Sequence, residues 1–519
     1  MKNLKQPSNW HAIVPTIAAA FFVIQIIPVY ENDIFLHTLL GGYLAHGGSA
    51  AGDPSWVFGP HLAEWHNTMA ASELVFYWLQ STLGWGGITL WAAISGAGFV
   101  MVFWRTALEQ IKQVTDKPTK RHYRLAGIAS LVAMLMFQSF FQTRPQSVIF
   151  AVLPIVAWQL LKIATIGTLP KWWQAFLFTW MLTCVHPTTI LFAPLMLGAL
   201  AVYTYVYRKT AKPLATWLKA LPVIAATAAA TLLTPAGISV YTSAISIREA
   251  ASNVTTEWLG VTSVVDPQVL VLLALAAIWL LAARRTSNPN TGQLLNRTAQ
   301  AEALLIIGLT VGFGSVRRTA AIAAVIIAVI ALNRWVDAIN LKPAKNSKPE
   351  KPANLWLTAP IGIAGIAVLA FGLIVQIPKI TIDPTRQPVE ITKQLVTQNP
   401  SAQVYVDYDI SSFVLYALRS GDPNFNPNGQ TAKAAVSFDG RLDYFGPQVL
   451  QDFVDANEGL ETATKMQPYL KATDAIVDQQ SAVVTYLKSN NWNIKATEPG
   501  IRPLGEKVTW VWLQAPASE

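Results

Sequence analysis

Three side chains that can carry protons follow the first apolar segment of the chain: Glu31, Asp33 and His37. A helix over residues 34–45 would have Asp33 as its N-cap and His37 on its first turn, so that both groups face the same membrane surface. A carboxylate and an imidazole in this arrangement can carry out acid–base chemistry. The same residues also suit a helix that is merely capped and solvated at the membrane surface, and position alone favours that simpler role.

The composition identifies the kind of protein that must hold these groups. Of 519 residues, 52% are hydrophobic and only 13% are charged, which is too apolar for a water-soluble enzyme of this length. Apolar runs of about 17 to 23 residues recur, each long enough to cross a hydrocarbon core as a helix. We expect a polytopic α-helical membrane protein with about 11 transmembrane helices, the first a retained signal anchor. The single Cys184 excludes an intramolecular disulfide and a cysteine-based metal cluster.

The distribution of charge predicts the orientation. Lys2 and Lys5 place the N-terminus in the cytoplasm, and 22 of the 26 Lys and Arg residues up to Pro378 then fall in cytoplasmic loops. The net charge of +9 therefore reflects topology, and we expect no nucleic-acid partner. The predicted location is the cytoplasmic membrane, with the C-terminal domain extracytoplasmic. The expected spans lie near residues 11–30, 88–103, 125–141, 147–162, 173–186, 188–206, 216–234, 267–283, 301–314, 319–333 and 355–377, and Arg334 begins a cytoplasmic loop.

Two domains are expected. Residues 1–378 would form the transmembrane domain, with outer loops 31–86 and 235–266, and the second loop would contain an amphipathic helix at the membrane surface over 238–260. Residues 379–519 would form a small extracytoplasmic α/β domain. Its expected strands are 403–408, 434–438, 474–477, 492–496 and 508–513, and its expected helices 411–420, 447–456 and 481–489. The turn Asp439-Gly440-Arg441 stands at a strand end, where such domains present polar sites, although turns favour these residues in any case.

Further polar residues fall on the same outer side as Asp33. Arg144, Arg317 and Arg318 violate the inside bias of basic residues, so each is expected to have an acidic partner or an anionic ligand. The other candidates on this side are Asp53, His186 and Glu257. Motifs for nucleotide binding, zinc hydrolysis and serine hydrolysis are missing from the sequence. A carboxylate and several cations at one membrane face suit sugar transfer from a lipid-linked phosphate.

Short motifs in this order resemble the GT-C superfamily of polytopic glycosyltransferases, and more closely a largely uncharacterised bacterial branch of it. The matching segments are DIFLH, GGYLAHG, GDPSW, TRPQ, VHP, TPAG, TEWLG, VRR, VYVDYD and SFDGRLDYFG. The chain departs from that pattern at Leu36, where an aromatic residue is usual, and at Ser411 and Ser412, where glycines are usual.

The resemblance implies a function and assigns roles. It implies inverting transfer of a hexose or pentose from a polyprenyl-phosphate donor to a cell-envelope glycan, lipid or protein. Asp33 would be the general base, with Glu31, Asp53 and His37 as further candidates. A divalent metal at the outer acidic loop is compatible with this chemistry, and no other cofactor is implied. The residues expected to contact phosphate are Arg144, His186, Arg317 and Arg318, and Glu257 is expected to hold the acceptor or an arginine.

A protein without catalytic activity remains the alternative. It would be an envelope-assembly scaffold or a transporter or flippase of lipid-linked sugar. Transporters usually show internal repeats and charges at mid-membrane depth, and the sequence shows neither pattern, which favours the enzyme. A scaffold would keep the same fold, so the sequence does not separate it from the enzyme.

Overall fold

The computed structural model describes residues 9–50, 52–62, 65–116, 118–209, 213–251, 267–286, 296–314, 316–341, 355–425, 433–502 and 505–516. The chain divides into two compact units, each assembled from separate stretches of sequence. The helical unit contains residues 1–27, 89–234 and 257–379. The mixed unit contains residues 28–88, 235–256 and 380–519. The first outer loop and the start of the second therefore belong to the same unit as the C-terminal domain.

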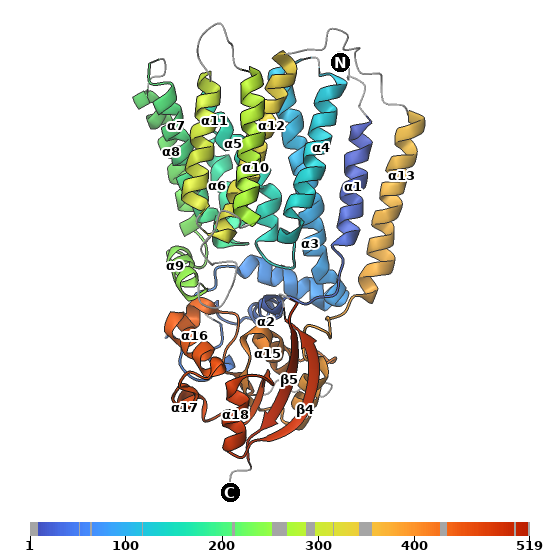
Figure 1. Cartoon of the computed structure of the whole chain (residues 1–519), viewed down its shortest axis with the longest axis vertical. Coiled ribbons are helices and arrows are strands. Elements are labelled where there is room, and N and C mark those ends of the chain that lie inside the picture. Colours follow the sequence, from blue (N-terminus) through green and yellow to red (C-terminus); the bar gives the residue numbers. More distant parts are fainter. Residues whose placement is uncertain are drawn as a thin grey trace. The chain divides into compact units, whose positions relative to one another are not determined.

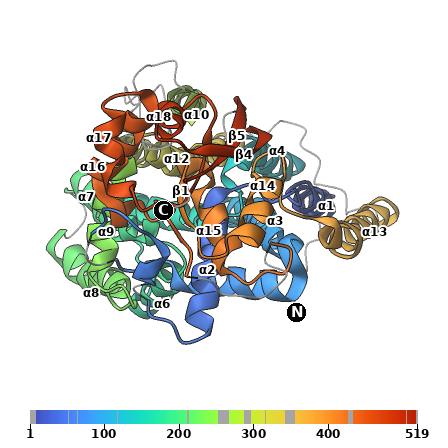
Figure 2. The same cartoon turned by 90° about the horizontal axis from the view of Figure 1, so that it is seen from below.

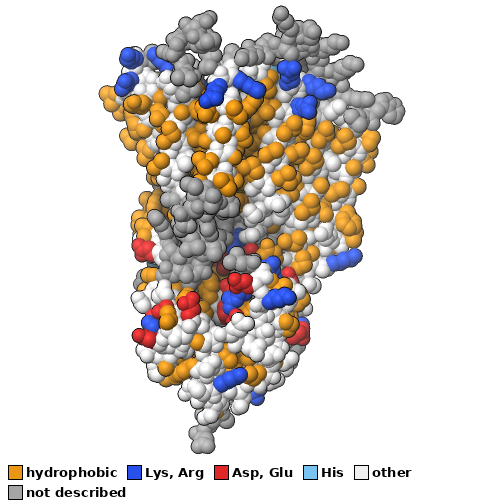
Figure 3. Space-filling view, viewed as in Figure 1, with side chains coloured by type: hydrophobic (Ala, Val, Ile, Leu, Met, Phe, Trp, Pro, Cys, Tyr) orange, Lys and Arg blue, Asp and Glu red, His pale blue; other side chains and the backbone are white. Residues whose placement is uncertain are grey.

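The helical unit is a bundle of upright helices with an apolar flank (Figures 1 and 3). Lys and Arg side chains gather at its upper end in Figure 3. Its helices are α1 (Trp10–Ile24), the second part of α3 (Ala70–Val114), α4 (Lys120–Phe137), α5 (Ser147–Ile166), α6 (Trp172–Thr183), α7 (Phe192–Val206), α8 (Pro213–Leu232), α10 (Pro267–Thr286), α11 (Arg297–Phe313), α12 (Arg317–Leu341) and α13 (Leu355–Phe371). Small and β-branched residues of α12, from Ala320 to Ile327, are all buried at its centre.

Eight helices in the described part of the chain are long and apolar enough to cross a membrane. The chain is thus an integral membrane protein, as its composition predicted, whereas the expected count of 11 spans is not confirmed. Three of the expected spans correspond to helices that are too short to be among these eight. They are α1 with 15 residues, α6 with 12 and α11 with 17.

One prediction about the helical unit is wrong. Arg334 was expected to begin a cytoplasmic loop, but it lies inside α12 and its side chain is only 1% exposed. Its Nε donates to Glu302 Oε2 at 2.7 Å, and the indole of Trp279 and the amide of Asn333 also donate to Glu302. The inside bias counts basic residues by sequence position, and it does not distinguish a loop cation from one that is neutralised between helices.

The mixed unit contains a five-stranded sheet in the order β2-β1-β3-β5-β4. β1 (Gln403–Val406) is parallel to β2 (Ala435–Val436) and β3 (Asp474–Asp478), and β5 (Lys507–Gln514) is antiparallel to β3 and β4 (Asn493–Ile501). The helices are α14 (Val389–Gln398), α15 (Ser411–Arg419), α16 (Leu442–Glu458), α17 (Thr462–Met466) and α18 (Ala482–Ser489). The α/β prediction is confirmed, although α14 was missed and β4 is longer than expected because it pairs with β5 along its whole length.

Segments from the membrane half complete this unit. They include α2 (Asn32–Ala45), the first part of α3 up to a kink at Gly84, and α9 (Ser239–Ala251), which is the described part of the amphipathic helix predicted over 238–260. The first outer loop extends the sheet, since Val57 pairs with Val436 of β2 and Phe58 N donates to its carbonyl oxygen. Hydrogen bonds along a sheet edge fix the loop to the C-terminal domain.

Candidate functional site

Two glycines bring α2 against α3. A Cβ atom on Gly41 would lie 2.0 Å from the carbonyl oxygen of Glu73, and one on Gly42 would lie 3.1 Å from the ring of Tyr77. Any side chain at residue 41 would therefore overlap the backbone of α3. The GG pair in the first outer loop thus has a structural reason, which is the close approach of two helices.

This close approach places His37 beside a buried carboxylate. His37 Nδ1 lies 3.1 Å from Glu73 Oε1, and the two side chains are 10% and 1% exposed. The other oxygen of Glu73 accepts a hydrogen bond from the Asn67 amide, whose own oxygen accepts from the backbone N–H of Met69 at 2.8 Å. The imidazole is therefore held by a chain of three polar groups anchored on the backbone.

Asp33 lies one helical turn before His37, on the first turn of α2. It is not the N-cap that the sequence predicted, because the helix begins at Asn32 and the N-cap position belongs to Glu31, whose side chain makes no capping hydrogen bond. The amide of Asn32 instead joins α2 to α15: it donates to the Tyr408 carbonyl and accepts from Phe413 N. Figure 2 shows the two helices side by side. The Asp33 carboxylate therefore lies within the first turn of α2, after the N-cap position.

The Asp33 carboxylate lies against the turn that the sequence singled out at the end of β2. A Cβ atom on Gly440 would be 3.3 Å from Asp33 Oδ1 and 3.1 Å from Ser412 Oγ, so glycine leaves just enough room for both. Ser412 is fully buried, and its hydroxyl has no hydrogen-bond partner in the described residues. Three segments that are distant in sequence thus meet at Gly440.

The DGR turn (Asp439, Gly440 and Arg441) is held by a buried ion pair. Arg441 Nε lies 3.0 and 2.9 Å from the two carboxylate oxygens of Asp439, and both side chains are at most 2% exposed. The guanidinium also lies over the rings of Trp65 and Tyr444, at 5.2 and 4.6 Å from their centroids. Aromatic faces and a carboxylate together replace the water that a cation loses on burial.

A second carboxylate joins the same turn to α9. Asp443 accepts hydrogen bonds from the indole N–H of Trp65 at 3.0 Å and from the hydroxyl of Ser243. Burial raises the pKa of Asp443, and these two hydrogen bonds and Arg441 partly offset that rise. Through Trp65 and Ser243, the first outer loop and α9 are both fastened to the start of α16.

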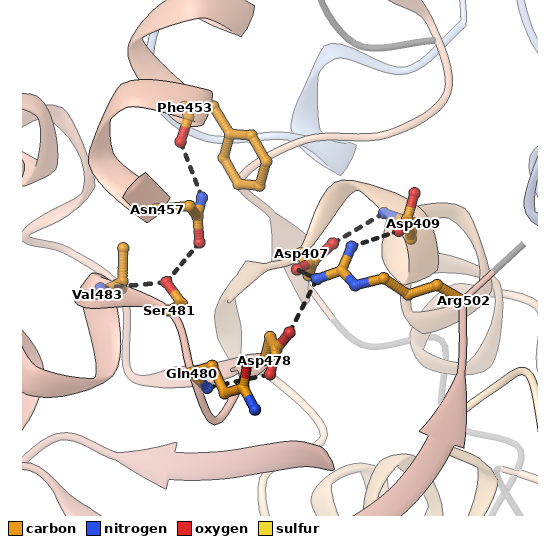
Figure 4. A network of polar contacts seen from close by, with 9 residues as sticks. All are labelled: Asp407, Asp409, Phe453, Asn457, Asp478, Gln480, Ser481, Val483 and Arg502. Atoms are coloured by element: carbon orange, nitrogen blue, oxygen red, sulfur yellow. Dashed lines mark hydrogen bonds and ion pairs between the residues drawn. The ribbon is translucent and has the colours of Figure 1, made fainter. Parts of the chain in front are cut away.

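A second possible ligand site lies at the ends of the parallel strands β1 and β3, and the side chain of Arg502 occupies it. The chain continues from β1 to β2 on one side and returns to β3 on the other, and ligands of open α/β sheets bind at such a switch point. Arg502 lies between Asp407, Asp409 and Asp478 there, with nitrogen–oxygen distances of 3.2, 2.5 and 3.2 Å (Figure 4). Burial, and then the neighbouring charge of Asp409, raise the pKa of Asp407 to about 6. Arg502 therefore occupies the space between the three carboxylates and pairs with each of them.

The remaining predicted residues have more ordinary local roles or lie elsewhere. Asp53 caps the 3-10 turn η1 (Pro54–Trp56) by accepting from Ser55 N at 2.9 Å. His186 caps η3 (Pro187–Leu191) through Nδ1, which accepts from Thr188 N and the Thr188 hydroxyl.

The predicted phosphate contacts belong to the helical unit. Arg144 lies in the turn before α5 and accepts a hydrogen bond from Trp91 on its carbonyl oxygen. Arg317 and Arg318 are the first residues of α12, and Glu257 lies outside the described residues. The approach of these groups to Asp33 stays a prediction. In the part of the chain that the structure describes, no three His, Cys, Asp or Glu side chains converge as metal ligands.

Sequence reasoning missed Glu73 as the partner of His37, and Asn67 as the partner of Glu73. Glu73 is 36 residues from His37, and nothing in the spacing of the two indicates a contact. The available signal was the Gly41-Gly42 pair, because adjacent glycines inside a helix usually mark the close approach of another backbone.

No protein-family model matches the chain, and no curated protein sequence matches it. Among solved structures, the apo oligosaccharyltransferase of Archaeoglobus fulgidus is similar over 90% of this chain and 69% of its own, with 11% identity and a TM-score of 0.48. ArnT from Cupriavidus metallidurans, bound to undecaprenyl phosphate, is similar over 98% of both chains, with 14% identity and a TM-score of 0.46.

The arabinofuranosyltransferase AftD from Mycobacteria is similar over 99% of this chain and 42% of its own, with 13% identity and a TM-score of 0.46. At these identities and TM-scores the similarities assign no fold family, no substrate and no site residue to this chain.

Proposed function

We propose that the chain is a glycosyltransferase that moves a sugar from a polyprenyl-phosphate donor to a hydroxyl group of a cell-envelope acceptor, with Asp33 as general base. One observation carries this proposal: the half-buried Asp33 carboxylate lies against Gly440 of the DGR turn, one helical turn before His37, which contacts Glu73. The donor class is taken from the sequence resemblance.

The proposed reaction is a displacement at the anomeric carbon of the donor sugar. Asp33 takes the proton of the acceptor hydroxyl, and the hydroxyl oxygen forms the new bond to the anomeric carbon. The bond from that carbon to the phosphate oxygen breaks, and the polyprenyl phosphate leaves with the electron pair. Attack opposite the leaving group inverts the anomeric configuration. The expected cation contacts, Arg144 and Arg317 among them, would stabilise the negative charge that develops on the phosphate.

The elements around Asp33 suit the task of a fixed base. Asn32 ties the first turn of α2 to α15, and Gly440 and the buried Ser412 limit where the carboxylate can move. The Asp439–Arg441 ion pair, in turn, fixes Gly440. A base held by its neighbours loses no rotational freedom when the substrate arrives, which is one source of enzymatic rate.

The experiment is transfer by the purified full-length protein in liposomes. Radiolabelled polyprenyl-phosphate hexoses and pentoses are offered together with an envelope extract, and the labelled product is separated from lipid. Asp33→Asn keeps the size of the side chain and removes the base. The matched control is Asp383→Asn in the same unit, because Asp383 only caps a surface turn through Thr385. Asp33→Asn should lower transfer about 10²-fold or more, and Asp383→Asn should leave it unchanged.

One combination of results would overturn the proposed function. If no donor supports transfer, and cells that carry Asp33→Asn keep a normal envelope, the proposal is overturned in favour of a scaffold or a transporter.

A further inference from the structure

The chain of hydrogen bonds behind His37 has a direction that the backbone sets. The backbone N–H of Met69 can only donate, so the Asn67 atom that it meets is the amide oxygen. The other end of the Asn67 side chain is then the NH2 group, and it donates to Glu73 Oε2. The Met69 N–H therefore determines the orientation of the Asn67 amide, and Asn67 in turn donates to Glu73.

The same reasoning assigns which ring nitrogen of His37 carries the proton. Glu73 is fully buried in α3 and receives Asn67 on one oxygen, while its other oxygen faces His37 Nδ1 at 3.1 Å. An ionised carboxylate has no hydrogen to give, so beside an ionised Glu73 it is Nδ1 that carries the proton and donates it. When this ring is neutral, its lone pair lies on Nε2, and a tenth of the side chain is exposed.

We propose that Glu73 and Asn67 are positioning residues that hold His37 with its proton on Nδ1, so that Nε2 serves as a second proton acceptor beside Asp33. This inference rests on the proposed transferase function. Asp33 and His37 are four residues apart on α2 and so share one face of the helix. After Asp33 has taken the proton of the acceptor hydroxyl, Nε2 takes that proton from Asp33 and releases it to water. Asp33 is thereby returned as a carboxylate for the next turnover.

The decisive variant is Glu73→Gln, because glutamine has the same shape but only one acceptor oxygen. If that oxygen accepts from Asn67, the NH2 group of the glutamine faces His37 and donates to Nδ1. The ring proton must then move to Nε2, which loses its lone pair. The variant thus reverses the tautomer without removing a side chain. The matched control is Glu109→Gln, since Glu109 pairs with Arg105 and Lys112 at the surface of the far end of α3.

The measurement is the nitrogen spectrum of the full-length protein labelled with [15N]histidine, because protonated and unprotonated ring nitrogens have well-separated shifts. The chain has 7 histidines, and His37→Asn identifies the pair of signals that belongs to His37. The wild-type protein and Glu109→Gln should show Nδ1–H, and Glu73→Gln should show Nε2–H. Asn67→Ala, which frees one oxygen of Glu73, should give a mixture of tautomers and serves if Glu73→Gln does not fold.

Transfer kinetics then test whether the tautomer matters. Glu73→Gln should lower kcat by about 10²-fold with little change in KM, because the substrate still binds while a proton acceptor is lost. An Nε2–H signal in the wild type, or an unchanged tautomer in Glu73→Gln, would overturn the positioning role. A reversed tautomer with unchanged kcat would overturn the role of Nε2 in turnover. Nδ1–H in a wild type that transfers no sugar would refute the proposed function alone and leave the tautomer assignment standing.

Discussion

Replacement of Gly41 by alanine should separate the two helices that form the candidate site. The added Cβ would lie 2.0 Å from the Glu73 carbonyl oxygen and 2.5 Å from the carbonyl carbon, and real Cβ contacts are essentially never under 3.0 Å. The clash is with backbone, so no side-chain rotation relieves it. The helices must therefore move apart by about 1 Å, and overpacking of this kind costs about 1–3 kcal/mol.

The same movement of the helices should also disturb the contact between His37 and Glu73. His37 is one turn before Gly41 on α2, so a shift of about 1 Å would lengthen its 3.1 Å contact with Glu73 beyond hydrogen-bonding distance. A misplacement of this size lowers catalytic rates by about 10²-fold. Stability and activity should therefore fall together in Gly41→Ala.

The assay compares Gly41→Ala with Gly98→Ala in the same detergent. Gly98 lies further along α3, and a Cβ atom there would meet nothing within 4 Å. Alanine at residue 98 should leave Tm unchanged or raise it slightly, because alanine favours the helix by up to about 1 kcal/mol. Gly41→Ala should have a clearly lower Tm and about 10²-fold slower sugar transfer. Equal Tm and equal activity of the two variants would refute the role assigned to the helix contact.

Three further outcomes follow from the buried charges. Asp439→Asn leaves Arg441 buried without its carboxylate and should destabilise the protein by about 3–5 kcal/mol, measured as a fall in Tm. Arg334→Met should destabilise by a similar amount, whereas the double change with Glu302→Gln should restore most of the loss, since the fully buried Glu302 carboxylate is then no longer left without its cation. The raised pKa of Asp407, about 6, means that the folded state holds this proton more tightly than the unfolded state. Its contribution to stability is therefore fully present below the ordinary pKa of 3.8 and is lost as pH rises to about 6, and in Asp407→Asn the difference in Tm between pH 5 and pH 7 should shrink.

Local patterns in the sequence were enough to predict the elements of the site. The four-residue spacing of Asp33 and His37 placed both on one helix, and the alternation of apolar strands and amphipathic helices after Ile380 predicted an α/β domain. The turn at Gly440 was recognised because turn residues follow a strand end. These features are determined by neighbours in sequence, and a single chain shows them directly.

The contacts that give these residues a role depend on pairs that the sequence does not connect. Asp33 meets Gly440, more than 400 residues later, and His37 meets Glu73, and no periodicity links such positions. The helix start was misplaced by two residues because Asp33, a residue type that favours the N-cap, lies inside the first turn of α2, which begins at Asn32 after the N-cap Glu31. Arg334 was misassigned because a basic residue near a predicted span end looks like a loop cation, whereas Glu302 neutralises it between helices.

The most direct test of the central claim is the ratio of transfer rates of Asp33→Asn and Asp383→Asn in liposomes, with the polyprenyl-phosphate sugar that gives the highest wild-type rate. We expect Asp383→Asn to match the wild type and Asp33→Asn to be slower by about 10²-fold or more, with both variants folded by Tm. Transfer by Asp33→Asn at the wild-type rate would contradict the assignment of Asp33 as the base.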